Sequence, residues 1–309
     1  MVLHSTPEYH LCPERQQTAM LRSMVVHSIL PDALTSAAAT TLEAAGISHV
    51  AHGTADFMRA AATAAADPEA VALLGPYRSA DIADAVVATA PAGLALLAPV
   101  ATWAGVTRDD EPGCNDPGYD EPAQHRGTVL RLVARDTEVA ARIASDVAVK
   151  GLRAFVVAGS HDYGRQLDDQ LRLAGLPRAE RAEDADLAIL AGLAGEPEIE
   201  IAAACSPLPL VAFDGVQGSA LGAREVRVAL PHAPAEGIPA QELLEGVHHA
   251  RLAAGLVVEA VADGAADRAS ILAAVRRNGG FDEHGDPVEP PVWLWRADAD
   301  WALSPDRPL

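Results

Sequence analysis

Hydrophobic and polar positions along this chain form one repeated pair of patterns. A run of about five apolar residues is followed by a longer amphipathic run, with Gly, Pro, Ala or Ser at the junction. Residues 71–173 show the repeat most clearly, with VALLG, LALLAP and AFVVAG as apolar runs. Such alternation is typical of parallel strands joined by crossover helices. The chain is therefore predicted to be an α/β protein.

The same reading extends along the rest of the chain. Thr54 and Asp136 are predicted to cap the helices that follow them, and Gly46 to end the first helix. Helices are expected over 31–45, from 54, over 238–262 and over 267–278. Strands are expected at 23–30, 47–53, 70–74, 153–158, 186–191, 208–213, 226–230 and 292–296.

Length and charge narrow the class of protein. A chain of 309 residues exceeds the usual size of a single core, so two lobes are expected. Half of the residues are apolar, which is enough to build those cores. The net charge of −20 argues against nucleic acid and anionic membrane surfaces as partners, because both need a concentrated basic face.

Cysteines, termini and loops add further limits. Cys12, Cys114 and Cys205 lie far apart without a CxxC pair, so neither a zinc site nor a disulfide framework is expected. No run approaches the ~18 apolar residues of a membrane span, so no membrane insertion is expected. The first twenty residues lack the apolar core of a signal peptide, which favours a cytoplasmic location for the sequence as it stands and an extracytoplasmic one if the start is truncated. Segment 109–127, with six acids and three prolines, is expected to be a solvated loop, since its acids lack EF-hand spacing.

Four polar residues follow predicted strands, where ligands of parallel sheets bind. Ser79 begins a helix, whose free N–H groups suit a carboxylate, although serine is also a common plain cap. Thr102 offers a hydroxyl from the neighbouring strand end, and the Ala101 carbonyl can accept from an ammonium; an ordinary loop threonine is the alternative. Tyr163 can close over a ligand from the next turn. Asp214 can pair with an ammonium or cap a helix.

Enzyme motifs are absent from the sequence. There is no GxSxG elbow, HExxH or P-loop, and GVQGSALG does not follow the dinucleotide pattern. His161 and Asp162 beside Tyr163 could suggest acid/base chemistry, but nothing else supports it. His248 and His249 are adjacent on a predicted helix and cannot face one metal, so solvated histidines are expected. No cofactor is predicted.

Several blocks in order resemble the leucine/isoleucine/valine-binding branch of the type 1 periplasmic binding proteins, which serve branched-chain amino acid ABC transporters. The blocks are GPYRSADIADA (75–85), APVATWAGVT (98–107), LRLVARD (130–136), GSHDYGRQL (159–167), VAFDG (211–215), FDEHGDP (281–287) and VWLWR (292–296). The resemblance implies two Rossmann-like lobes with parallel central sheets joined by three crossovers. It places residues 1–130 plus 238–280 in lobe 1 and 131–237 plus 281–309 in lobe 2.

The resemblance also implies a ligand site. Ser79 and Thr102 correspond to the pair that holds the ligand carboxylate, and Asp214 to the acid that holds the ammonium. Tyr77 and Trp103 are candidate walls. The implied function is clamping a small amino acid or amide-like zwitterion for an ABC permease, and the alternative is a cytosolic sensor that controls a regulatory protein partner. Two departures from the family are the short segment SILPDALTS (28–36) and the pair Gly192 and Leu193, where an aromatic residue is usual.

Overall fold

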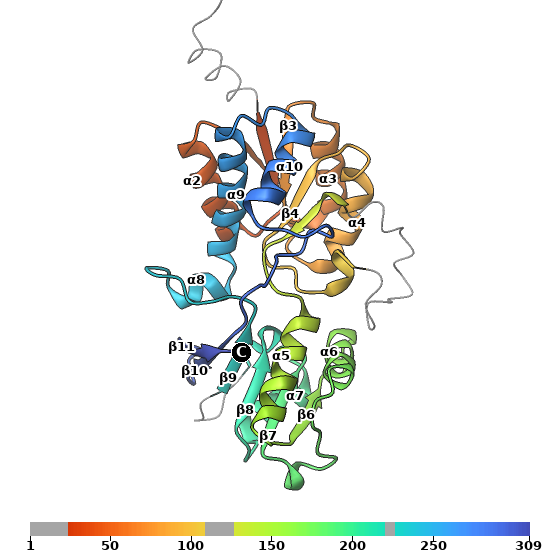
Figure 1. Ribbon diagram of the computed structural model, residues 1–309, viewed down its shortest axis with the longest axis vertical. Coiled ribbons are helices and arrows are strands. Elements are labelled where there is room, and N and C mark those ends of the chain that lie inside the picture. Colours follow the sequence, from red (N-terminus) through yellow and green to blue (C-terminus); the bar gives the residue numbers. More distant parts are fainter. Residues whose placement is uncertain (1–23, 109–126, 220–225) are drawn as a thin grey trace, which may run out of the picture.

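Two lobes stacked along the long axis make up the protein (Figure 1). The structure, a computed structural model, describes residues 24–108, 127–219 and 226–309. One sheet has the strand order β2-β1-β3-β4-β5 and the other β11-β10-β9-β8-β7-β6. The expected two-lobed α/β architecture is confirmed. The N-terminal twenty residues, Cys12, Cys114 and nearly all of the acidic segment lie outside the described residues.

The upper lobe is a parallel sheet covered on both faces. Its strands are β1 (Val25–Ser28), β2 (Ser48–Ala51), β3 (Ala70–Leu74), β4 (Ala95–Ala98) and β5 (Val129–Arg131). Ala72 and Leu74 of β3 pack on one face of the sheet, and Leu73 between them packs on the other. Because both faces are buried, the strand is a continuous apolar run rather than an alternating one.

Among the described residues, five helices form the two outer layers of this lobe. Helices α2 (Asp32–Ala44), α9 (Val247–Ala262) and α10 (Arg268–Asn278) pack on one face, and α3 (Phe57–Ala66) and α4 (Ser79–Thr89) on the other. Thus α9 and α10, far along the chain, complete the core begun by residues near the N-terminus (Figure 1).

The lower lobe has the same layered arrangement of a sheet between helices, but one edge of its sheet is antiparallel. Strands β6 (Ala154–Ala158), β7 (Leu187–Ala191), β8 (Leu210–Phe213) and β9 (Val226–Leu230) are parallel, whereas β10 (Trp293–Ala297) and β11 (Leu303–Pro308) are antiparallel. Helices α5 (Asp136–Val149) and α6 (Asp162–Leu173) cover one face, and α7 (Pro197–Cys205) and α8 (Ala240–Leu244) the other. The expected parallel central sheet is confirmed, and its edge adds an antiparallel pair of which β11 was not predicted.

Several predicted helix limits differ from the structure. The helix expected over 238–262 is two helices, because Gly246 adopts the left-handed region at φ 79° and separates α8 from α9. Thr54 begins a short 3₁₀ helix and caps nothing. Ser79 and Asp136 are the first residues of their helices, so each predicted cap lies one position too late.

The chain passes between the lobes three times, from β5 to α5, from β9 to α8 and α9, and from α10 to β10 (Figure 1). We propose the limits 130/131, 237/238 and 280/281 as lobe boundaries, since each falls near one of these passages. Leu243 of α8 nevertheless packs into the lower-lobe core, so α8 belongs by contact to that lobe.

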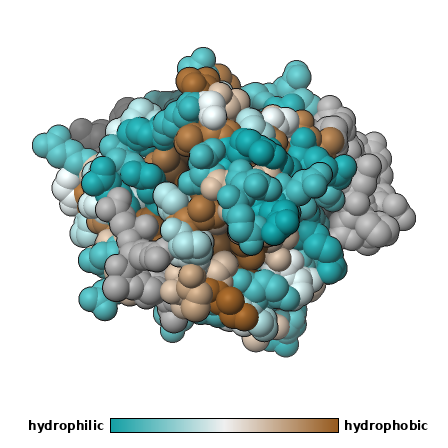
Figure 2. Space-filling model, turned by 90° about the horizontal axis from the view of Figure 1, so that it is seen from below, coloured by the Kyte–Doolittle hydropathy of each residue, from teal (hydrophilic) through white to brown (hydrophobic). Residues whose placement is uncertain are grey.

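The surface of the lower lobe mixes hydrophilic and hydrophobic areas. The end of the lower lobe is mainly hydrophilic, with smaller hydrophobic areas between the polar groups (Figure 2). Across the described ranges, every helix is too short or too polar to cross a bilayer.

Candidate functional site

A cavity of about 700 Å³ lies between the lobes, with walls from both. Six of the seven predicted site residues line it, and Ala101 alone does not. The upper lobe contributes Tyr77, Arg78, Ser79, Ala80, Val100, Thr102 and Trp103, and the lower lobe His161, Asp162, Tyr163, Gln166, Leu193, Asp214 and Gly215. The strand ends that the sequence pattern singled out thus converge on one space.

The upper wall is formed by the turns after β3 and β4. Ser79, at the start of α4, accepts a hydrogen bond through Oγ from the backbone N–H of Trp103 at 3.4 Å. This contact joins the two turns. The N-terminus of α4 supplies a partial positive charge beside the Ser79 hydroxyl, which favours a carboxylate.

Arg131 holds the turn after β4 through hydrogen bonds to three of its carbonyl oxygens. Its Nη1 donates to the carbonyl oxygens of Ala101 at 3.2 Å and Trp103 at 2.8 Å, and Nη2 donates to the Ala104 carbonyl at 3.3 Å. Ala101 is 1% exposed and its carbonyl is engaged by Arg131. The structure therefore does not place Ala101 where its carbonyl would meet a ligand ammonium.

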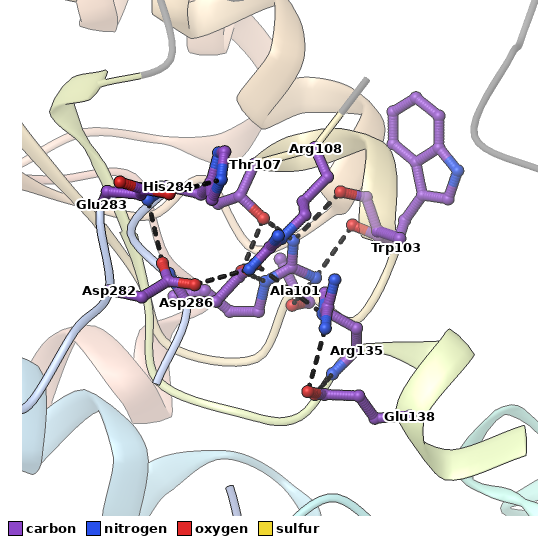
Figure 3. Close-up of polar contacts among 12 residues, drawn as sticks. Ala101, Trp103, Thr107, Arg108, Arg135, Glu138, Asp282, Glu283, His284 and Asp286 are labelled. Carbon is purple, nitrogen blue, oxygen red and sulfur yellow. Dashed lines mark hydrogen bonds and ion pairs between the residues drawn. The ribbon is translucent and has the colours of Figure 1, made fainter. Parts of the chain in front are cut away.

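Asp286 balances the buried charge of Arg131. Arg131 Nε donates to Asp286 Oδ1 at 3.1 Å, and Arg108 Nε donates to Oδ2 at 2.9 Å (Figure 3). Burial by itself would raise the pKa of Asp286, but Arg131, the Thr107 hydroxyl and Arg108 outweigh it and lower that pKa. The support behind the upper wall is thus an ionised, hydrogen-bonded network.

The Asp214 carboxylate and the Tyr163 phenol line the lower wall, and the buried Asp136 carboxylate lies behind them. The Tyr163 hydroxyl lies 3.4 Å from Asp136 Oδ1 and 3.3 Å from Asp214 Oδ1, and it can donate to only one at a time. The backbone N–H of Asp136 also donates to the Thr102 carbonyl at 2.8 Å, which links the two walls. Asp136 was predicted only as a helix cap. Asp136 follows β5 and the short connection after that strand, just as Ser79, Thr102, Tyr163 and Asp214 follow theirs. This position is the signal in the sequence that would have identified Asp136 as a candidate site residue.

The electrostatics of this wall favour a cation. Burial and then the charge of Asp214 raise the pKa of Asp136 to about 7, although Thr102 and Arg131 oppose the shift. Burial likewise raises the pKa of Asp214. Burial and the two carboxylates raise the pKa of Tyr163 well above 10, so its phenol stays neutral. A bound ammonium would stabilise both carboxylates in their ionised form.

Glu196 shapes the remaining edge of the cavity. Its carboxylate accepts from the backbone N–H groups of His161 and Leu193, both at 2.6 Å, and so ties the turns after β6 and β7. His161 Nδ1 accepts from the Tyr163 backbone N–H at 3.2 Å and caps α6. This structural use of His161 leaves the acid/base interpretation without support. Leu193 reaches the cavity where an aromatic residue was expected.

Metal and thiol chemistry find no site in the part of the chain that the structure describes. No group of three His, Cys, Asp or Glu residues there could hold a metal ion, and Cys205 is an exposed free thiol. The interpretation of His248 and His249 as solvated is wrong for His249, which is 4% exposed. Position on a helix alone did not reveal that this face packs against the lower lobe.

Comparisons with solved structures identify the fold. The chain superposes on an ABC transporter substrate-binding protein from Desulfitobacterium hafniense with TM-score 0.68 and 18% identity, covering 92% of this chain and 99% of that one. It matches a branched-chain amino acid transporter substrate-binding protein from Streptococcus pneumoniae in complex with isoleucine at TM-score 0.68 and 16% identity, over 92% and 99% of the two chains. A leucine-binding protein from Thermotoga maritima gives TM-score 0.67 and 14% identity, over 93% and 98%.

No protein-family model and no curated protein matches the chain. The comparison therefore depends on the structural matches. At such low sequence identities these matches show the fold alone. The chain has the type 1 periplasmic binding protein fold, and the resemblance inferred from the ordered sequence blocks is confirmed at that level.

Proposed function

We propose that this protein clamps a small amino acid or amide-like zwitterion between its lobes, as the substrate-binding component of a branched-chain amino acid ABC transporter does. One observation carries the proposal. Ser79 and Thr102 on one lobe and Tyr163 and Asp214 on the other line a single cavity, so groups suited to a carboxylate face groups suited to an ammonium.

Each end of the ligand has a matching partner. The ligand carboxylate would accept from the Ser79 hydroxyl and from N–H groups at the start of α4, and from the Thr102 hydroxyl when that group turns from Asp136 to the ligand. Its ammonium would lie against Asp214, with Asp136 and Tyr163 next to it. A ligand that contacts both lobes stabilises the closed arrangement in proportion to its differential affinity for that state.

The solved relatives favour the amino-acid class. One bears isoleucine and another, from Desulfitobacterium hafniense, bears Leu. An ABC permease is the partner that this class implies. The proposed role is binding without chemistry, so ligand recovered from the protein should be unchanged when its NMR spectrum is compared with that of the starting compound.

A thermal-shift screen of L-amino acids and their amides tests the proposal. A ligand at a hundred times its Kd should stabilise the protein by ~2.7 kcal/mol. For any amino acid that binds, the matching amine without the carboxylate and the matching acid without the ammonium serve as controls, and both should shift the melting point far less. If no zwitterion shifts it, or if either half-ligand binds as tightly as the whole, the proposal is wrong.

A further inference from the structure

A second, smaller cavity, which we call the inner chamber, adjoins the main one at the junction of the lobes. Its volume is about 30 Å³, and it shares Val100 and Asp214 with the main cavity. Its walls are Val100, Val133, Asp214, Leu230, Pro231, His232, Leu243 and His249. Since Asp214 lines both spaces, the inner chamber lies next to the proposed ammonium site.

Two histidines from different segments line the inner chamber, and a tryptophan packs against one of them. His232 follows β9 in the second connection between the lobes, His249 lies on α9, and Trp295 lies on β10. The ring centroids of His232 and His249 are 5.0 Å apart, and those of His232 and Trp295 6.2 Å apart. The three side chains are 7%, 4% and 2% exposed.

Four buried nitrogens of this group have no hydrogen-bond partner among the described residues. They are Nδ1 and Nε2 of His232, Nδ1 of His249 and Nε1 of Trp295. An unmade hydrogen bond of a buried group costs about 1–3 kcal/mol, so a molecule that supplies partners here gains binding energy. Three of the four belong to His232 and His249, which line this small space, and they indicate a place built for a polar guest.

The charge state of the histidines limits what that guest can be. Burial, followed by the neighbouring histidines, lowers the pKa of His232 to about 3, and burial, followed by His248, lowers that of His249 to about 4. Both rings are therefore neutral near pH 7, and each has one donor and one acceptor. With the Asp214 carboxylate adjacent, the inner chamber suits a hydroxyl or amide and disfavours an anion.

We propose that the inner chamber is a specificity subsite that binds the hydroxyl or amide end of the ligand's side chain. This inference rests on the proposed function and narrows its ligand class to polar amino acids such as those of the threonine and asparagine type. A volume of this size admits the terminal polar atom of a side chain, such as the hydroxyl oxygen of threonine or one of the amide heteroatoms of asparagine. An aliphatic side chain of equal size would leave the nitrogens unpaired.

Isothermal titration calorimetry with two matched pairs tests the subsite: L-threonine against L-valine, and L-asparagine against L-leucine. Within each pair the shapes are similar and only the polar group differs. We expect the polar member to bind at least about tenfold more tightly to the wild type, because one net hydrogen bond to a buried group is worth ~1.4 kcal/mol. In His232→Phe, which keeps a ring and removes both nitrogens, that ratio should fall below about threefold.

Two further variants keep the test decisive. His249→Phe keeps a ring and removes both of its nitrogens, and it should lower the ratio even if His232→Phe does not fold. His248→Phe, on the neighbouring residue outside the inner chamber, is the matched control and should keep the wild-type ratio. A wild type that prefers valine and leucine, or a ratio unchanged in both His232→Phe and His249→Phe, overturns the subsite but leaves the proposed function standing. Failure of all four amino acids to bind overturns both.

Discussion

Arg131 Nε lies 3.1 Å from Asp286 Oδ1, and the two side chains are 0% and 3% exposed. Arg131 ends β5 at the first connection between the lobes, and Asp286 lies in the third. The pair therefore joins two of the three connecting segments. The same guanidinium holds the turn that carries Thr102 and Trp103. One buried ion pair therefore stabilises both the junction between the lobes and the upper wall of the site.

Arg131→Met should lower the free energy of unfolding by about 3–5 kcal/mol, the usual cost of breaking a buried pair from one side. The variant also removes the donors to the Ala101 and Trp103 carbonyls. Urea denaturation measures the change. Arg181→Met is the control, since its partner is Glu183 and both side chains are 72% exposed; it should cost less than about 1 kcal/mol. Equal effects in the two variants would contradict the role given to Arg131.

Asp214→Asn should weaken binding of a zwitterion by at least ~1.5–3 kcal/mol, the range for hydrogen bonds to charged groups. The free energy of unfolding of the empty protein should stay the same or rise, because the charge is desolvated there. Calorimetry and urea denaturation measure the two quantities. Asp169→Asn, at an exposed position of α6, should alter neither. Undiminished affinity in Asp214→Asn would place the ammonium elsewhere.

Affinity for an ammonium ligand should rise with pH up to about 7 and level off above it. Protonated Asp136, with its pKa of about 7, competes with the ligand cation, so binding below pH 7 releases a proton. Titrations at pH 5.5, 7 and 8.5 in buffers of different ionisation enthalpy measure that release. Asp136→Asn should flatten the profile, and a profile that keeps its slope in this variant would assign the titration to another group.

The raised pKa of Asp136 makes the free energy of unfolding fall with rising pH, whereas ligand affinity rises. Its pKa is raised above the ordinary 3.8, so the folded empty protein binds more protons than the unfolded chain between pH 3.8 and about 7. Stability from this group is therefore lost as pH rises through that range. Comparing wild type with Asp136→Asn isolates the effect, since the difference in unfolding free energy should grow from pH 4.5 to 7 in favour of the variant.

The inner-chamber histidines should make the protein sensitive to acid. Their pKa values of about 3 and 4 lie below the ordinary 6.5, so the unfolded chain binds more protons between these limits and stability falls as pH drops from 6.5 towards 4. One such ring contributes up to ~1.4 kcal/mol per pH unit. His232→Phe should therefore show a shallower fall in urea denaturation from pH 6.5 to 4.5. His284→Phe, with a 38% exposed side chain, is the control and should match the wild type.

Much of the architecture follows from the sequence because it depends on local patterns. The limits predicted for β3 and β9 agree with the structure, since each is an apolar run bounded by residues that end strands. The placement of Ser79 with Thr102 at one sheet edge, and of Tyr163 with Asp214 at another, was also predictable, because carboxyl ends of parallel strands share one edge of a sheet.

Only the tertiary structure decided which polar groups meet across long separations. Nothing near Arg131 in the sequence points to Asp286, 155 residues away, and nothing near His249 points to His232. The antiparallel edge strands β10 and β11 likewise depend on a return of the chain from the upper lobe. Local periodicity reports which face of an element is apolar. The pairing of buried charges and rings depends instead on how whole lobes pack, and that is set by contacts between segments far apart in the chain.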